Sequence, residues 1–174
     1  MVKRILTHPD PVLVKKSCEI EKITPQILEL ARDMVETMYE NQGIGLAAPQ
    51  VGECVRLITV DVTGPENREG LITIVNPKII STDGEVESDE GCLSVSNFRS
   101  VVKRAARVRV SGMDLEGNEL SLEAEDLLAI CLQHEIDHLE GVLFIDRISR
   151  LKRTLYEKRL AKWNKKKNLS ASSS

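Results

Sequence analysis

Aromatic residues, histidines and long hydrophobic runs are all scarce in this sequence of 174 residues. Phe, Trp and Tyr make up 3% of it, which leaves few side chains that could stack on bases or sugars. The longest apolar runs, such as Leu127–Leu132, are far shorter than the ~20 residues that cross a bilayer, and the N-terminal residues lack the apolar region of a secretory signal. We therefore expect a soluble, cytoplasmic protein that binds no membrane.

Cysteine is also infrequent, and positive charge is not in excess. The 4 cysteines stand at irregular spacings in a chain long enough to fold without disulfides, so free thiols or metal ligands are favoured over a disulfide framework. Lys and Arg total 24 against 27 Asp and Glu, and the formal net charge of −3 argues against general nucleic-acid binding. With 41% apolar residues, the length suits a single domain.

Two segments combine helical periodicity with residues typical of helix ends. Thr24 and Pro25 supply an N-cap and a proline at the first helical position, and the apolar residues that follow recur at three- and four-residue steps. They predict a helix over residues 25–42 with one face in a core. Residues 127–139 have helical composition, with Gly141 placed as a C-cap, and this helix is expected to be buried.

A third helix is predicted over residues 149–163, with basic residues at its exposed positions. It runs into Lys165–Lys167 and a serine-rich end, a composition that cannot form a core. We expect residues 166–174 to be disordered and residues 1–165 to form the domain.

Segments rich in β-branched residues lie between the first two helices. They cover residues 56–62, 71–80 and 104–110 and are separated by turn residues, which predicts short antiparallel strands. The Gly- and Pro-containing segment Gly43–Gln50 is expected to break the first helix as a loop in which the backbone can approach a ligand closely. The order of elements predicts an α+β fold with helices packed on antiparallel strands.

Two of the 3 histidines form the pattern H-E-x-x-H within the buried helix, as His134, Glu135 and His138. Residues four apart lie on one face of a helix, so both imidazoles can reach one metal ion while Glu135 points toward a bound water. The alternative is that both histidines are hydrogen-bonded core residues and Glu135 is a solvated carboxylate.

A catalytic site of this kind usually has three protein ligands and an open position for water. The histidine that completes a longer protease pattern is replaced by Phe144, which cannot bind metal, and Glu157 lies in the basic C-terminal helix, a poor context for a ligand. Cys92, in the sequence E-G-C-L-S, is the best candidate for the third ligand, because a thiolate with two imidazoles suits both Fe²⁺ and Zn²⁺.

Three segments together resemble the signature motifs of bacterial peptide deformylases, in their order and in their spacing. They are G-I-G-L-A-A-P-Q at Gly43–Gln50, E-G-C-L-S at Glu90–Ser94 and Q-H-E-I-D-H at Gln133–His138. The resemblance covers nearly the whole chain. It implies an α+β fold in which antiparallel strands surround a buried metal-binding helix, with an N-terminal helix and the C-terminal helix of the type common in bacteria.

The resemblance implies hydrolysis of the N-formyl group of the initiator formyl-methionine of new polypeptides, with release of formate. Cys92, His134 and His138 are then the ligands of one divalent ion, which the family suggests is Fe²⁺, although the same ligands accept Zn²⁺, Ni²⁺ or Co²⁺. Glu135 is the expected general base for a water bound to the ion.

The resemblance assigns further residues to the substrate. The side-chain amide of Gln50 and the backbone N–H of Leu93 are expected to stabilise the oxyanion. The other positions comprise glycines that contact an extended peptide, residues of the pocket for the methionine side chain, and an arginine near the cleft. These are Gly45, Gly91, Ile44, Ile130, Cys131 and Arg99.

Two alternatives from other classes stay open on the sequence alone. Cys131, His134 and His138 follow one another at steps of three and four, so Cys92 could close a structural zinc site that holds no water. The basic segment from Arg147 to Lys167 also fits a ribosome-associated module without enzymatic activity. The resemblance favours an active enzyme that binds the ribosome through this helix.

Overall fold

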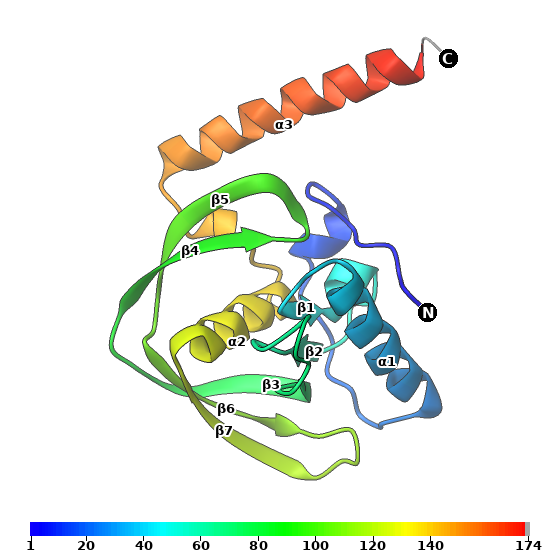
Figure 1. Ribbon diagram of the computed structural model, residues 1–174, viewed down its shortest axis with the longest axis vertical. Helices are drawn as coiled ribbons and strands as arrows, with labels where there is room; N and C mark the ends of the chain where they lie inside the picture. The colour runs from blue at the N-terminus through cyan, green and yellow to red at the C-terminus, as the bar shows by residue number, and fades with distance from the viewer. Residues whose placement is uncertain (173–174) are drawn as a thin grey trace.

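The computed structural model describes residues 1–172, in which two antiparallel sheets and three α-helices form an α+β fold (Figure 1). The helices are α1 (Pro25–Glu40), α2 (Asp126–Leu139) and α3 (Arg150–Ala171). The strands are β1 (Gly45–Ala47), β2 (Leu57–Val60), β3 (Ile72–Asp83), β4 (Val86–Cys92), β5 (Val95–Arg104), β6 (Arg107–Met113) and β7 (Glu119–Glu125). Short 3-10 helices lie at Pro11–Val14, Ala48–Val51 and Phe144–Asp146.

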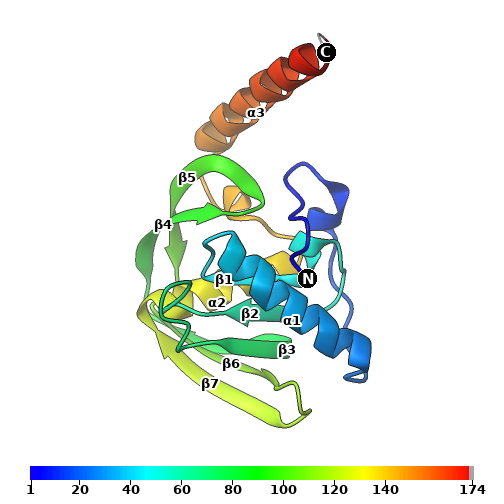
Figure 2. The same cartoon turned by 45° about the vertical axis from the view of Figure 1, so that its right-hand side comes forward.

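The strands surround α2, as the sequence resemblance implied. Five of them form a sheet in the order β1-β2-β3-β6-β7, and β4 pairs with β5 as a separate two-stranded sheet. In Figures 1 and 2, α2 lies between the five-stranded sheet and the β4-β5 hairpin, while α1 covers β1 and β2 from the outside. The fold class expected from the sequence is therefore confirmed.

The main core forms between α2 and the larger sheet. Leu132, Ile136 and Leu139 of α2 are buried against strand residues such as Ile58 and Val110. Complete burial of a side chain of this size contributes about 1.5–3 kcal/mol, so this face fixes α2 firmly on the sheet. Gly141 has a φ of 73° and ends α2, in the C-terminal position predicted for it.

The first helix begins where the sequence predicts and ends two residues earlier. Thr24 Oγ1 accepts the backbone N–H of Ile27 at 3.4 Å, and Pro25 occupies the first turn. The helix ends at Glu40, and Gln42 adopts a left-handed φ of 57° that no helix accommodates.

Several strands differ from the sequence-based prediction. The segments 56–62, 71–80 and 104–110 correspond to β2, β3 and β6, with shifted ends. Part of the predicted loop Gly43–Gln50 is strand β1, because Gly45–Ala47 pairs with Ile58–Val60 of β2. Strands β4, β5 and β7 were not predicted as separate strands.

The C-terminal helix is longer than expected. Ser149 Oγ accepts the N–H of Lys152 at 3.3 Å as its N-cap, and the helix continues past Trp163 to Ala171. Residues 166–171 are thus helical, contrary to the predicted disorder, because Lys166, Lys167, Leu169 and Ala171 are good helix formers that extend an existing helix. Ser173 and Ser174, the end of that predicted tail, lie outside the described residues.

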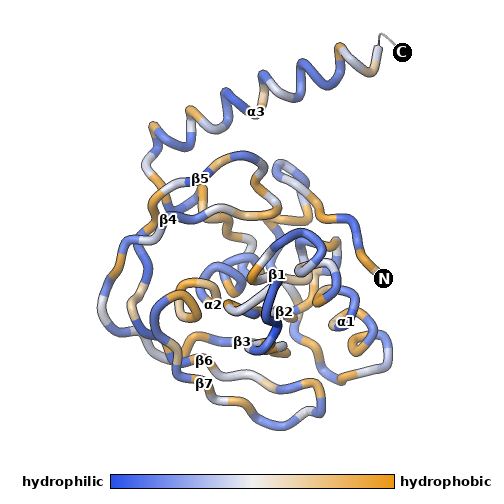
Figure 3. The backbone as a smooth tube through the Cα atoms, in the orientation of Figure 1, coloured by the Kyte–Doolittle hydropathy of each residue, from blue (hydrophilic) through white to orange (hydrophobic). Residues whose placement is uncertain are grey.

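Tyr156 is the buried residue of α3, and the rest of the helix projects from the body of the molecule (Figures 1 and 2). Hydrophilic residues run along α3, with isolated hydrophobic ones between them (Figure 3).

None of the helices within residues 1–172 combines the length and the apolarity that a bilayer crossing requires.

Candidate metal centre and cleft

Cys92, at the end of β4, meets His134 and His138 of α2. One ligand atom from each residue lies within 4.8 Å of the other two. Cys92 Sγ is 3.3 Å from His138 Nε2, and the two imidazole centroids are 5.1 Å apart. The structure thus brings together the three residues that the sequence singled out as metal ligands.

Local structure holds each of these donors in place. The two histidines are four residues apart on α2, so their rings lie on the same helix face. Cys92 precedes the tight connection to Val95 of β5, where the N–H of Ser94 donates to Cys92 Sγ at 3.4 Å.

The donor set fits a divalent transition metal ion. A thiolate and two imidazoles are borderline-soft ligands, and three protein ligands leave room for a water. Glu135 Oε2 is buried and has no hydrogen-bond partner within residues 1–172, as expected for an acceptor directed at a group other than protein. Burial lowers the pKa of His138, which keeps its imidazole in the neutral form required for binding.

The two other candidate ligands that the sequence offers do not join this cluster. Glu157 of α3 pairs with Arg153 at 3.1 Å. The thiol of Cys131, which the closed structural site would need, instead donates to the backbone oxygen of Ile44 at 3.5 Å. Neither residue belongs to the ligand group found within residues 1–172.

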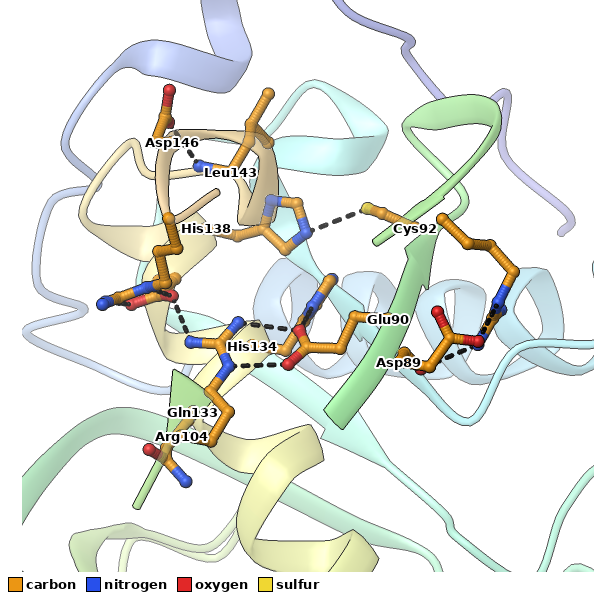
Figure 4. Close-up of polar contacts among 12 residues, drawn as sticks. Asp89, Glu90, Cys92, Arg104, Gln133, His134, His138, Leu143 and Asp146 are labelled. Carbon is orange, nitrogen blue, oxygen red and sulfur yellow. Dashed lines mark hydrogen bonds and ion pairs between the residues drawn. The ribbon is translucent and has the colours of Figure 1, made fainter. Parts of the chain in front are cut away.

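Sequence reasoning missed the residue that orients His134. Glu90 Oε1 lies 2.9 Å from His134 Nδ1, which leaves Nε2 as the nitrogen available to a metal (Figure 4). Arg104 donates to both oxygens of Glu90, each at 2.8 Å. Burial alone would raise the pKa of Glu90, but Arg104 and His134 outweigh burial and lower it to about 2, so Glu90 remains an acceptor.

Glu135 lies between the metal ligands and β1. Its side chain is buried, and a Cβ atom added to Gly45 would collide with its carboxylate and lie 2.8 Å from Cys131 Sγ. Gly45 is thus required for the carboxylate to approach the strand. Burial raises the pKa of Glu135 to about 7, which suits a group that exchanges a proton near neutral pH.

A cleft of about 690 Å³ opens beside the cluster, between β1, β4 and α2. It is lined by most of the residues that the sequence assigned to the site, while His138 lies behind them. The predicted residues in its lining are Ile44, Gly45, Gln50, Gly91, Cys92, Leu93, Arg99, Ile130, Cys131, His134 and Glu135.

Gln50 is buried at the inner end of the cleft. Its Oε1 accepts the N–H of Ala47 at 2.8 Å, which fixes the orientation of the amide. Its Nε2 donates to Ser94 Oγ at 3.2 Å and lies 3.6 Å from Cys92 Sγ. A fixed N–H donor beside the candidate metal centre can stabilise negative charge that develops there.

Arg99 lies across Gly91 at the rim of the cleft. A Cβ atom at Gly91 would lie 2.9 Å from Arg99 Nη1, so the glycine makes room for the guanidinium. Asp89 holds this arginine, since its carboxylate accepts from Arg99 Nε at 3.1 Å and its backbone oxygen from Nη2 at 2.8 Å.

A cysteine, two histidines and a buried carboxylate beside a cleft define a metal-dependent hydrolase. Comparison with known proteins identifies the kind of hydrolase. The family model described as "Polypeptide deformylase" matches residues 2–154. The chain therefore belongs to the polypeptide deformylase family and is an enzyme of that family, which confirms the resemblance drawn from its three motifs.

Similar proteins share nearly the whole chain. A peptide deformylase of Syntrophobacter fumaroxidans is 49% identical over 93% of this chain and 94% of its own. The crystal structure of a peptide deformylase from Legionella pneumophila is 42% identical, has a TM-score of 0.90 and covers 97% of this chain and 98% of that one. A peptide deformylase from Ehrlichia chaffeensis, solved in complex with actinonin, is 42% identical with a TM-score of 0.85 and covers 92% and 96%.

Proposed function

We propose that this enzyme removes the N-formyl group from the initiator formyl-methionine of new polypeptides and releases formate. The observation that carries the proposal is the Cys92, His134 and His138 cluster beside the buried carboxylate of Glu135, at the wall of a cleft in a peptide deformylase fold. These three residues would hold one divalent ion, and a thiolate ligand is compatible with Fe²⁺ as the native metal.

A divalent ion bound at this position would lower the pKa of a water and polarise a carbonyl. Glu135 takes a proton from the water as the water oxygen attacks the formyl carbon, and it delivers the proton to the methionine nitrogen as the C–N bond breaks and formate is released. Its burial supports this role, because a carboxyl with a pKa of about 7 can hold or release a proton near neutral pH. Gln50 Nε2 and the backbone N–H of Leu93 donate to the formyl oxygen as it gains negative charge.

The edge of β1 receives the substrate as an additional strand. β1 ends the five-stranded sheet, and Ile44 and Gly45 face the cleft that Gly91 borders on the opposite side. An extended peptide bound there gains main-chain hydrogen bonds, while its methionine side chain enters the pocket of Ile44, Ile130 and Cys131. Arg99 contacts the peptide at the rim.

The test is formate release from a formyl-methionyl tripeptide by protein that is prepared without oxygen and loaded with Fe²⁺. We expect the Glu135→Gln variant to keep its metal and to lose activity by a factor of about 10²–10⁴, the usual contribution of a general base. Glu123→Gln, which changes an exposed carboxylate outside the cleft, is the matched control and should remain active. Metal-loaded wild-type protein that releases no formate would overturn the proposal.

We also propose that α3 docks the enzyme on the ribosome, where new polypeptides emerge. The support is its composition and position. Apart from buried Tyr156 and partly buried Arg153 and Leu160, the helix is exposed; it projects from the body and is rich in Lys and Arg along its length. Such a helix can contact an anionic surface without blocking the cleft between β1, β4 and α2.

A further inference from the structure

A chain of ion pairs runs from His134 to the base of α3. Arg104 bridges two carboxylates, because its Nη1 donates to Asp137 Oδ2 at 2.6 Å while its Nε and Nη2 hold Glu90. Asp137 in turn accepts from Arg147 Nε and Nη2, each at 2.6 Å. Figure 4 shows Arg104 beside Glu90 and His134, with dashed lines joining the partners.

We propose that Arg147 is a positioning residue of the metal centre, which acts on His134 through Asp137, Arg104 and Glu90. The inference rests on the proposed metal site. Arg147 follows the 3-10 helix Phe144–Asp146 and contributes nothing to the lining of the cleft, and the ion pairs link its guanidinium to His134.

The alternation of charges along these ion pairs explains why Arg147, the last residue of the series, affects the metal centre. From Glu90 to Arg147, the ion pairs alternate between carboxylates and guanidinium groups. Each carboxylate therefore has a cation, and Arg104 is shared by Glu90 and Asp137. Arg104 is 2% exposed, and electrostatic attraction in such a buried site is little screened. Without Arg147, Asp137 competes more strongly for Arg104, and the hold of Arg104 on Glu90 weakens.

His134 depends on this hold more than His138 does. Glu90 fixes which nitrogen of His134 carries the proton and how its ring is turned. His138 Nδ1 is buried without a hydrogen-bond partner within residues 1–172, so no comparable side chain orients that ring. Arg147, at the outer end of this series of ion pairs, thus controls the orientation of His134.

The experiment measures Co²⁺ binding, by competition with a chelator and by the visible absorption spectrum of bound Co²⁺, for wild type, Arg147→Met and Arg147→Lys. We expect Arg147→Met to bind about tenfold more weakly, the lower end of the effect of losing a partner of a metal ligand, and to show a changed spectrum. Arg147→Lys keeps the positive charge and should recover part of the affinity.

Arg153→Met is the matched control. Arg153 lies near the start of α3, is 40% exposed against 43% for Arg147, and pairs with Asp146 and Glu157 instead of Asp137. Its loss should leave Co²⁺ affinity and spectrum unchanged. Thermal melting of the metal-free proteins shows whether any variant has lost its fold.

A double-mutant cycle tests the route. If Arg147 acts through Glu90, the variant carrying both Glu90→Gln and Arg147→Met should bind Co²⁺ no more weakly than Glu90→Gln alone. Additive losses, or wild-type affinity and spectrum in Arg147→Met, would overturn the inference while leaving the metal site in place. Failure of wild-type protein to bind Co²⁺ would overturn the metal site itself and the inference with it.

Discussion

Asp61 is a fully buried carboxylate outside the cleft, in the residue that follows β2. It accepts hydrogen bonds from the hydroxyl of Tyr39 at 2.6 Å, from the N–H and hydroxyl of Thr63 at 2.9 and 2.7 Å, and from the N–H of Gly64 at 3.1 Å. Its own N–H donates to the backbone oxygen of Ile44 at 2.8 Å. Asp61 therefore ties the loop after β2 to the start of β1, beside the cleft.

This residue should make stability depend on pH. Burial alone would raise the pKa of Asp61, but the hydrogen bonds from Tyr39, Thr63 and Gly64 outweigh it and lower the pKa. A carboxyl with a lower pKa in the folded state stabilises the protein above its unfolded pKa of about 3.9, and this contribution is lost as the pH falls through the folded pKa. We expect Asp61→Asn to cost roughly 1.5–3 kcal/mol at pH 7.

Urea unfolding of wild type and Asp61→Asn at pH 7 and at about pH 3 measures this dependence. The difference between the two proteins should shrink at the lower pH, because below the unfolded pKa the unfolded chain binds a proton at Asp61 that the folded protein resists. Glu29→Gln changes an exposed carboxylate of α1 and is the control, which should have a smaller effect at pH 7. A difference that stays constant with pH would contradict the assignment.

At the scale of single residues, the sequence predicted those parts of the site whose arrangement follows from their spacing along the chain. His134, Glu135 and His138 share one helix, so their arrangement follows from helical geometry. The resemblance added Cys92 and Gln50. Glu90 was overlooked, although it stands two residues before Cys92, because its partner Arg104 is 14 residues away along the chain and no local periodicity connects them.

At the scale of elements, strands were missed where pairing rather than composition determines them. β4 reads V-E-S-D-E-G-C, which is poor in β-formers, and within residues 1–172 it pairs only with β5, placing Glu87 opposite Lys103. β7 is equally charged, and its Glu123 lies opposite Arg109 of β6. Cross-strand pairs of opposite charge stabilise such strands, but their register depends on the partner strand.

The element that the sequence underestimated, α3, supports a prediction about the proposed ribosome docking. Reversing three exposed charges with Lys162→Glu, Lys165→Glu and Lys166→Glu should reduce co-sedimentation with ribosomes, because binding to nucleic acid releases counterions from phosphates. The slope of log affinity against log salt should become shallower by about one for each phosphate that α3 no longer neutralises.

Formate release by this triple variant should remain at the wild-type level, since α3 contributes no residue to the cleft lining. A control with the same change in charge reverses Arg4, Lys15 and Lys22, which are exposed on other parts of the chain. Equal co-sedimentation of wild type and the α3 variant would contradict docking through α3.

At the scale of the whole molecule, the metal centre joins parts that the core clusters keep separate. One cluster packs α2 on the larger sheet, a second packs α1 on β1 and β2, and a third places Phe144 and Tyr156 against residues of β5. Cys92 comes from the β4-β5 hairpin and the histidines from α2. The sequence predicted the helix faces that build the first two clusters, whereas the hairpin depends on long-range polar contacts.

Arg104 is the residue on which this union depends most. It belongs to β5 and bonds Glu90 of β4 and Asp137 of α2, all buried. Arg104→Met should destabilise the protein by about 3–5 kcal/mol, because the buried carboxylate of Glu90 loses its cation and that of Asp137 loses one of its two. Urea unfolding measures the loss in free energy. Arg109→Met removes an exposed ion pair with Glu123 and should cost no more than about 1 kcal/mol. Equal losses of unfolding free energy in both variants would show that the buried ion pairs of Arg104 do not stabilise the contact between the β4-β5 hairpin and α2.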